Sequence, residues 1–403
     1  MLHTVVSLHG SPRGVQRAET GIAKGLAGTE YGLLAYDTIA VNLLHVVPGE
    51  VGGSEEYAVR TLSAYARHGS PDLVPVLHVL TPFVAAHRLL CEAFDTVVSP
   101  LDGANRARRI LAESTWLATR TTDVDAVHHL GGRLPGRSRR PAAVTIHDLQ
   151  PLLRPENFSP AKRAFMARSL PRTARHADLL VAPSHAVADK LASRLGVGTE
   201  RLAVVSVGAE RIADGPNRPT DPPTVLYPAA TYPHKNHLVL VEAFARIANR
   251  HPDARLVMTG TPGRADGEVR TAVAATELGE RIVLTGRIAA AELEALLAGA
   301  TIVAFPSAYE GFGIPVLEAL AAGVPVVVGA GTPAAEMAGG RVPVVDPSDP
   351  AAWAEALDLL LGDAGRRDRV ARAGLTRVAG RTWEDSAARL EDAWRRLLAT
   401  GRS

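Results

Sequence analysis

The sequence predicts an α/β protein made of two doubly wound domains, each built around a parallel sheet. From residue 38 onward, short apolar runs alternate with helical segments. The runs lack polar alternation, as in sheets that are buried on both faces. A second series of the same kind begins at residue 224. Residues 209–223, dense in Pro, Asp and Gly, separate the two series, and no regular element is expected there.

These patterns divide the chain into five parts. Residues 1–36 carry no sustained periodicity and are expected to form an extension, with at most a short helix near 15–26. The predicted parts that follow are a first domain over 37–208, a linker over 209–223, a second domain over 224–380 and a final helical segment over 381–403. Strands are expected at 38–46, 73–80, 95–99, 125–130, 142–147, 178–183 and 202–207, then near 224–228, 255–260, 281–285, 301–305, 324–328 and 342–345.

Capping residues predict where several helices begin and end. Ser54 is expected to cap a helix that has acidic residues in its first turn and that stops at Gly69. Ser184 is expected to cap the helix that begins at His185. A last helix is expected over about 384–399.

Composition restricts the class of protein. The chain has 403 residues, of which 46% are hydrophobic and 21% charged, which is typical of a globular protein of about two domains. The net charge of +2 gives no general argument for nucleic-acid binding. The single cysteine, Cys91, excludes an intrachain disulfide and fits a reducing, cytoplasmic location. No apolar run is long enough to span a bilayer, because Glu318, Gly323 and Pro325 interrupt the best candidate, 316–331.

The most informative stretch places two carboxylates around a glycine-rich loop. An apolar run at 301–306 leads to Glu310, Pro315 can open a helix that contains Glu318, and a second apolar run follows at 324–328. A loop between a parallel strand and a helix N-terminus is where α/β proteins bind anions. Ionised carboxylates accept hydrogen bonds from sugar and ribose hydroxyls. The stretch therefore predicts a nucleotide-sugar site.

A simpler interpretation needs no ligand. Glu318 would complement the helix dipole in a first turn, and Glu310 would be a solvated loop acid. Either acid alone fits that interpretation. Both together, with Gly-Phe-Gly-Ile-Pro between them, favour the ligand site.

The stretch resembles the Glu-x7-Glu signature of retaining glycosyltransferases of family GT4, which have the GT-B fold of two Rossmann-like domains facing across a cleft. The resemblance covers roughly residues 38–400 and is most specific at 301–331. It implies that Glu310 holds the transferred sugar, that Glu318 accepts from the ribose, and that loop amides contact the diphosphate. In that family the last helix crosses back to the first domain. The donor-binding residues implied here are Glu310, Gly311, Phe312, Gly313, Ile314 and Glu318.

Lys235 is a candidate phosphate ligand, because it stands at a strand-to-helix junction. The stretch 227–237 resembles the family's phosphate-binding loop, and its His-Lys-Asn-His form resembles a mannosyltransferase-like branch. Many members carry an arginine five residues before the lysine, where this chain has Ala230. Arg264 or Arg287 is expected to compensate. The alternative is an exposed lysine at a helix start.

Two further candidates lie in the first domain. Gly52 and Gly53 follow the first strand, and the resemblance implies that this loop faces the diphosphate and sugar; a plain tight turn is the alternative. His147 ends another strand, where family members carry a histidine near the transferred sugar. Its alternative is an ordinary strand end with an Asp turn at Asp148.

Other motifs receive less weight. Asp123 and Asp125 form an Asp-x-Asp pair, but it lies away from the glutamate loop with no third carboxylate, so metal binding is not expected. A structural role is favoured for His128 and His129, since strand neighbours point to opposite faces. Helix 160–176 interleaves basic and apolar residues. It suits either a membrane surface, with a lipid-linked acceptor, or a solvated face over a core stripe.

The expected function is a metal-independent retaining hexosyltransferase, with Glu310, His147 and Lys235 as catalytic residues. It would need no cofactor and would use a nucleotide-sugar co-substrate, GDP-mannose in preference to a UDP-sugar. The acceptor would be a glycan, a lipid-linked molecule or a small molecule. A GT-B sugar phosphorylase, a catalytically degenerate partner protein and a nucleotide-sugar epimerase are the alternatives.

Overall fold

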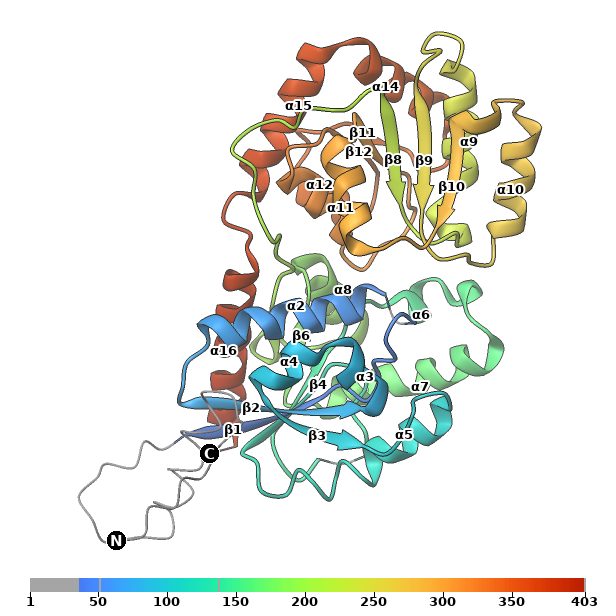
Figure 1. Ribbon diagram of the computed structural model, residues 1–403. Helices are drawn as coiled ribbons and strands as arrows, with labels where there is room; N and C mark the ends of the chain where they lie inside the picture. Colours follow the sequence, from blue (N-terminus) through green and yellow to red (C-terminus); the bar gives the residue numbers. More distant parts are fainter. Residues whose placement is uncertain (1–35, 51, 137, 402–403) are drawn as a thin grey trace, which may run out of the picture. The chain divides into compact units, whose positions relative to one another are not determined.

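A computed structural model describes residues 36–50, 52–136 and 138–401. The described residues form two compact units. One runs to Val207 and resumes at Trp383, and the other is Gly208–Thr382. Each unit has one parallel sheet with helices packed on it (Figure 1). The expected extension, including the short helix near 15–26, lies outside the described residues except for Tyr36.

The first unit contains a seven-stranded parallel sheet with the order β3-β2-β1-β4-β5-β6-β7. All seven strands overlap the predicted ones, because apolar runs buried on both faces give a strong sequence signal. The strand order reverses between β1 and β4, and the crevice at such a reversal is where open α/β sheets bind ligands. The strands are β1 Asp37–Asn42, β2 Leu73–Leu80, β3 Asp95–Ser99, β4 Ala126–His129, β5 Ala142–Thr145, β6 Leu179–Ala182 and β7 Leu202–Val204.

The helices of this unit include the last one of the chain, α16. Trp394 of α16 stacks edge-on against Tyr65 at 5.0 Å and donates its indole N–H to Nδ1 of His128 at 3.0 Å. Ser386 donates to the carbonyl of Ser206 at 2.6 Å. These contacts make α16 part of the first unit's core. The helices are α2 Gly53–His68, α3 Thr81–Ala86, α4 Arg88–Ala93, α5 Arg106–Ser114, α6 Gln150–Leu153, α7 Pro160–His176, α8 His185–Leu195 and α16 Trp383–Thr400, with 3₁₀ turns η1 Pro155–Asn157 and η2 Thr199–Arg201.

One predicted helix cap is wrong. Helix α2 begins at Gly53, and Gly52 takes the N-cap position with φ of 61°, so the Ser54 side chain does not cap it. The carbonyl of Gly52 accepts from the amides of Glu55 and Glu56 at 3.0 and 3.2 Å. A glycine that tolerates positive φ lets the helix start earlier than the serine signal predicts. The cap at Ser184 is confirmed by its bond with the amide of Val187.

The second unit contains a six-stranded parallel sheet with the order β10-β9-β8-β11-β12-β13. Its strand order reverses between β8 and β11. The strands are β8 Thr224–Pro228, β9 Arg255–Thr259, β10 Ile282–Gly286, β11 Ile302–Phe305, β12 Val326–Gly329 and β13 Val344–Val345. The helices are α9 His237–Ile247, α10 Asp266–Ala275, α11 Ala290–Gly299, α12 Ile314–Ala321, α13 Pro333–Ala338, α14 Pro350–Gly362 and α15 Ala364–Val378, with 3₁₀ turns η3 Pro233–Lys235 and η4 Gly279–Arg281.

Residues 209–223, predicted as a linker, contain no helix or named strand and belong to the second unit. The amide of Asn217 donates to the carbonyls of Ala298 and Ala300 at 3.2 and 2.7 Å, which holds the segment along this unit. Ala209 donates to the carbonyl of Arg381 at 2.9 Å, so the two chain segments that lead to the first unit run side by side. Within the described part of the chain, no helix has both the length and the apolar character needed to cross a bilayer.

Candidate functional site

Two loops meet at the strand reversal of the second sheet, one after β8 and one after β11. Lys235 of the first loop donates from Nζ to Oε1 of Glu310 in the second at 2.5 Å. The exposed fractions of the two side chains are 17% and 10%. Nζ also lies 5.5 Å from the ring centre of Phe305. The two predicted residues, 75 positions apart, thus form a mostly buried ion pair.

Three residues that sequence reasoning missed hold these loops together. The hydroxyl of Tyr227 donates to the carbonyl of Lys235 at 2.6 Å and lies 3.1 Å from Oγ of Ser307. Asn236, with φ of 53°, donates its amide to the carbonyls of Pro306 and Pro347 at 3.0 and 2.9 Å. Asparagine tolerates this left-handed conformation, so an Asn directly before a helix was the available signal. The Lys235 loop is therefore fixed without help from its own ion pair.

The glycine-rich loop ends at the start of α12, which begins at Ile314, one residue before the Pro315 that was predicted to open it. Gly313 occupies the N-cap position with φ of 94°, and a Cβ placed there would lie 3.0 Å from Cβ of Ala334. Among the described residues, no hydrogen bond engages the amides of Phe312, Gly313 or Ile314. Free N–H groups at a helix N-terminus attract anions such as phosphate.

The ligand-free interpretation of the two glutamates does not match their positions. Glu318 is the fifth residue of α12 and lies past the first turn, where a carboxylate would complement the helix dipole. Glu310 is mostly buried against Lys235 and is not a solvated loop acid. Lys235 is likewise not the exposed lysine of its alternative interpretation.

Arg264 lies in a segment that is bonded to Thr231, the residue next to Ala230, where many family members have an arginine. The residues on both sides of Arg264 bond to Thr231: Gly263 donates to its Oγ1 at 2.7 Å and Ala265 donates to its carbonyl at 2.9 Å. Arg264 itself is exposed. Arg287 is also exposed, directly after β10. The two bonds to Thr231 favour Arg264 as the substitute cation.

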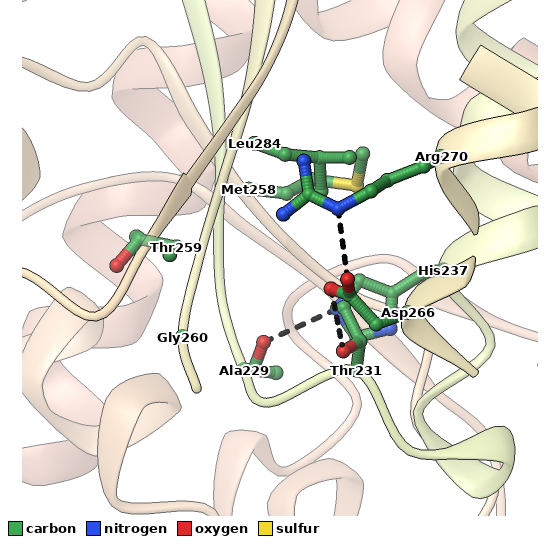
Figure 2. Close-up of a pocket in the computed structure, with 10 residues that line it drawn as sticks. Ala229, Thr231, His237, Met258, Thr259, Gly260, Asp266, Arg270 and Leu284 are labelled. Carbon is green, nitrogen blue, oxygen red and sulfur yellow. Dashed lines mark hydrogen bonds and ion pairs between the residues drawn. The ribbon is translucent and has the colours of Figure 1, made fainter. Parts of the chain in front are cut away.

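A small pocket lies beside these loops (Figure 2). Asp266, which lines it, is hydrogen-bonded to Thr231 of the Lys235 loop. Asp266 accepts from Oγ1 of Thr231 at 3.2 Å and from Nε of Arg270 at 2.8 Å, and the Arg270 bond lowers the pKa of Asp266. The volume of about 10 Å³ admits about one water molecule. The lining residues are Ala229, Thr231, His237, Met258, Thr259, Gly260, Asp266, Arg270, Leu284 and Gly286.

The histidines that flank Lys235 are neutral at pH 7. Burial, together with the charge of Lys235, lowers the pKa of His234 and of His237 to about 4. His237 hydrogen-bonds through Nε2 to the carbonyl of Ala229 at 3.2 Å. Lys235 therefore supplies the positive charge of this loop.

In the first unit, His147 follows β5 and is held in one orientation. Its Nε2 lies 2.9 Å from the carbonyl of Leu130, and its ring packs edge-on against Tyr57 at 5.4 Å. Burial lowers the pKa of His147 to about 4, so the ring is neutral. Because Nε2 must donate to the carbonyl, Nδ1 is left as a hydrogen-bond acceptor.

The loop after β1 brings a residue that the sequence did not single out. Both ring nitrogens of His45 are buried without a hydrogen-bond partner among the described residues. Burial, with His147 and Arg109 nearby, lowers the pKa of His45 to about 3. Gly52 and Gly53, at the start of α2, are exposed. The first unit therefore presents neutral imidazoles and exposed backbone around its own strand reversal.

The two histidines of β4 and Asp125 have structural partners. His128 bonds through Nε2 to Oγ1 of Thr145 at 2.8 Å, and Nδ1 of His129 lies 3.0 Å from the amide of Asn42. Asp125 accepts from the amide of Thr38 at 2.7 Å. In the described part of the chain, no group of three His, Cys, Asp or Glu side chains could hold a metal ion. Metal independence of the reaction stays a prediction.

Sequence comparison connects both units to one class of enzyme. The family model "Glycosyltransferase Family 4" matches residues 51–210, and "Glycosyl transferases group 1" matches residues 209–377. A D-inositol 3-phosphate glycosyltransferase of Corynebacterium diphtheriae is 29% identical over 54% of this chain, which spans 56% of that relative's length. A relative of the same name from Catenulispora acidiphila is 28% identical over 88% of this chain and 93% of its own length. The O-antigen chain mannosyltransferase RfbU of Salmonella typhimurium is 23% identical over 76% of this chain and 86% of its own length.

Solved structures share the fold. Sucrose-phosphate synthase from Thermosynechococcus elongatus aligns with a TM-score of 0.71 at 21% identity, covering 90% of this chain and 100% of that one. Anabaena HepE, solved in complex with UDP and glucose, aligns with a TM-score of 0.67 at 17% identity, covering 89% of this chain and 100% of that one. At these identities the likeness concerns the fold alone.

Proposed function

The chain belongs to glycosyltransferase family 4 and has the GT-B fold, and from that premise we propose that it transfers a hexose from a nucleotide-sugar donor with retention of configuration. The main support for a donor site is the Lys235–Glu310 ion pair, which lies at the strand reversal of the second sheet. Beside it stand the unbonded amides of the glycine-rich loop. One cation, one carboxylate and free amides match the phosphates and hydroxyls of such a donor.

Each group has a proposed role in the reaction. Lys235 and the amides of residues 312–314 neutralise the departing diphosphate, which is electrostatic stabilisation of charge that grows in the transition state. Glu310 accepts from hydroxyls of the sugar, and Glu318 accepts from the ribose. His147, through its free Nδ1, accepts from a hydroxyl near the reacting sugar.

The bond changes need no side-chain nucleophile. The acceptor hydroxyl oxygen bonds to the anomeric carbon on the face from which the diphosphate leaves. The carbon–oxygen bond to the diphosphate breaks, and its electron pair goes to the departing oxygen. The same oxygen takes the hydroxyl proton. Comparing the anomeric configuration of donor and product by NMR tests retention, and turnover in the presence of a chelator tests metal independence.

The donor and acceptor are proposed from different observations. The His-Lys-Asn-His loop and the mannosyltransferase RfbU support GDP-mannose, whereas HepE was solved with UDP. Relatives named for D-inositol 3-phosphate, one of them aligned over 88% of this chain, make a phosphorylated polyol the first small acceptor to test.

Calorimetric titration with GDP and with UDP, without added metal, tests the donor site. We expect one nucleotide to bind. Glu318→Ala should weaken that binding about tenfold to a hundredfold, since charged hydrogen bonds to the ribose are lost. Glu336→Ala, at an exposed position of α13, is the matched control and should bind as the wild type does. Unchanged binding by Glu318→Ala would refute the role of that residue.

Binding of neither nucleotide by folded protein would refute the donor proposal. It would favour a sugar phosphorylase, which phosphate-dependent cleavage of a disaccharide would reveal. A catalytically degenerate partner protein is the less favoured alternative. Lys235, Glu310 and Glu318 are all present, and Lys235 forms an ion pair with Glu310.

A further inference from the structure

One segment of the first unit has a strong charge imbalance. Residues 131–176 include ten arginines and lysines but only two acidic residues. Because the whole chain has a net charge of +2, the remainder of the chain is net acidic. Helix α7 alone carries five of these cations and no carboxylate. A helix on which charges of one sign are concentrated attracts a partner of the opposite charge.

Three of these cations and Phe165 share one side of α7, and Phe158 lies just before the helix begins. Lys162, Phe165, Arg168 and Arg172 follow one another at spacings of three, three and four, while Leu170 is buried on the opposite side. We name this side the α7 basic surface. It consists of Phe158, Lys162, Phe165, Arg168 and Arg172 with Arg106 of the adjacent α5 (Figure 1).

Cation–ring contacts and hydrogen bonds hold this surface together. Nζ of Lys162 lies 4.5 Å from the ring centre of Phe158, and Cζ of Arg106 lies 6.0 Å from that of Phe165. Arg172 donates to the carbonyls of Leu134 and Gly136 at 3.4 and 3.0 Å. Both phenylalanines are half-buried, so part of each ring reaches the surface beside a cation.

The arginines of α7 also differ from other surface arginines in their charge partners. Arg389 pairs with Asp385 at 2.8 Å, and Arg395 pairs with Asp72 at 3.0 Å. In the ranges that the structure describes, none of the ion pairs uses Arg168 or Arg172. Within the described residues, the charges of Arg168 and Arg172 are therefore not balanced by a carboxylate.

We propose that the α7 basic surface docks the protein on an anionic lipid bilayer. Lys and Arg side chains attract lipid phosphates, and half-exposed aromatic rings suit the depth of the headgroups. Nucleic acid is also anionic, but a base would stack on the face of an aromatic ring. Cations already occupy positions against Phe158 and Phe165. This inference goes beyond the transfer reaction and needs neither donor nor acceptor for its test.

The experiment measures flotation of the full-length protein with vesicles of phosphatidylglycerol and phosphatidylcholine, against vesicles of phosphatidylcholine alone. We expect binding to the anionic vesicles only, weakening at high salt. The double variant Lys162→Glu/Arg168→Glu should bind about tenfold or more weakly, because two attractive charges become repulsive. Arg369→Glu/Arg372→Glu on α15 changes the net charge equally at side chains that are 71% and 67% exposed, and should bind within about twofold of the wild type.

Two outcomes would overturn the proposal. One is absence of wild-type binding to anionic vesicles, or equal loss of binding in both double variants, which would indicate a response to net charge alone. The other is tight binding of a single-stranded oligonucleotide that anionic vesicles fail to displace. If the first double variant unfolds, Arg168→Glu alone replaces it. Nucleotide titration of the same variant should give wild-type affinity, which separates this proposal from the donor site.

Discussion

Lys235 and Glu310 are close because β8 and β11 are neighbours in the sheet, although the residues are 75 positions apart. The sequence identifies each residue through its own loop motif. It does not show that they pair, because that contact depends on strand order and on the bonds made by Tyr227 and Asn236. A mostly buried ion pair is sensitive to loss of one partner, since the other charge remains poorly solvated.

Removing the cation alone should harm both stability and donor binding. In Lys235→Met, Glu310 stays mostly buried without its partner, and we expect a loss of about 1–3 kcal/mol in the free energy of unfolding. Nucleotide affinity should fall about tenfold or more, because the phosphate loses its cation. Urea unfolding and calorimetric titration measure the two effects.

The double variant Lys235→Met/Glu310→Gln separates these effects. Neutralising the stranded carboxylate should restore most of the stability while nucleotide affinity stays low. Recovery of wild-type nucleotide affinity in the double variant would show that Lys235 serves the fold and is not a phosphate ligand.

At the scale of elements, the strands were predictable and the helix faces less so. Every predicted strand overlaps an observed one, because buried parallel strands are continuous apolar runs. In α9, Leu238 and Ala245 have the spacing of an apolar stripe but are only half-buried, whereas Leu240 and Phe244 lie inside. His237 also lies inside, because its ring nitrogen hydrogen-bonds to the carbonyl of Ala229. A polar residue at a buried position makes the buried side of a helix harder to predict from the sequence.

Gly313 links an element boundary to the anion site. Its φ of 94° strains any other residue, and an added Cβ would lie 3.0 Å from Cβ of Ala334. We expect Gly313→Ala to lower the free energy of unfolding by about 1–3 kcal/mol and to weaken nucleotide binding by displacing the amides at the start of α12.

Gly331→Ala is the matched control for that change. Gly331 has φ of 72°, but nothing lies within 4 Å of an added Cβ. It should lose stability through backbone strain alone and keep its nucleotide affinity. Thermal unfolding and titration of both variants decide the matter, and equal loss of affinity in the two would mean that the effect of Gly313 is general destabilisation.

At the scale of the whole molecule, the two units differ in how many neutral histidines they bury. Burial lowers the pKa to about 3 for His45, His128 and His129, and to about 4 for His78 and His147, all in the first unit. The second unit has two such residues, His234 and His237, each at about 4. The sequence shows the histidines but not their burial, which requires strand order and the packing of α16.

This difference predicts that acid destabilises the first unit more steeply. Below about pH 6.5 the unfolded chain binds protons at these histidines while the folded chain does not, so stability falls as the pH falls toward the folded pKa values. Each such histidine costs up to about 1.4 kcal/mol per pH unit in that window. With five such histidines among the described residues of the first unit and two in the second, the first unit should unfold at the higher pH.

Tryptophan fluorescence can follow the units separately during urea unfolding at about pH 7.5 and about pH 5.5. Trp116, Trp383 and Trp394 report on the first unit and Trp353 on the second, so Trp353→Phe isolates the first signal. We expect the first unit's midpoint to drop further between the two pH values, because its larger set of neutral imidazoles must be released to water before they can charge. Equal shifts of the two transitions, or a rise in stability on acidification, would show that these histidines are charged or accessible in the folded protein.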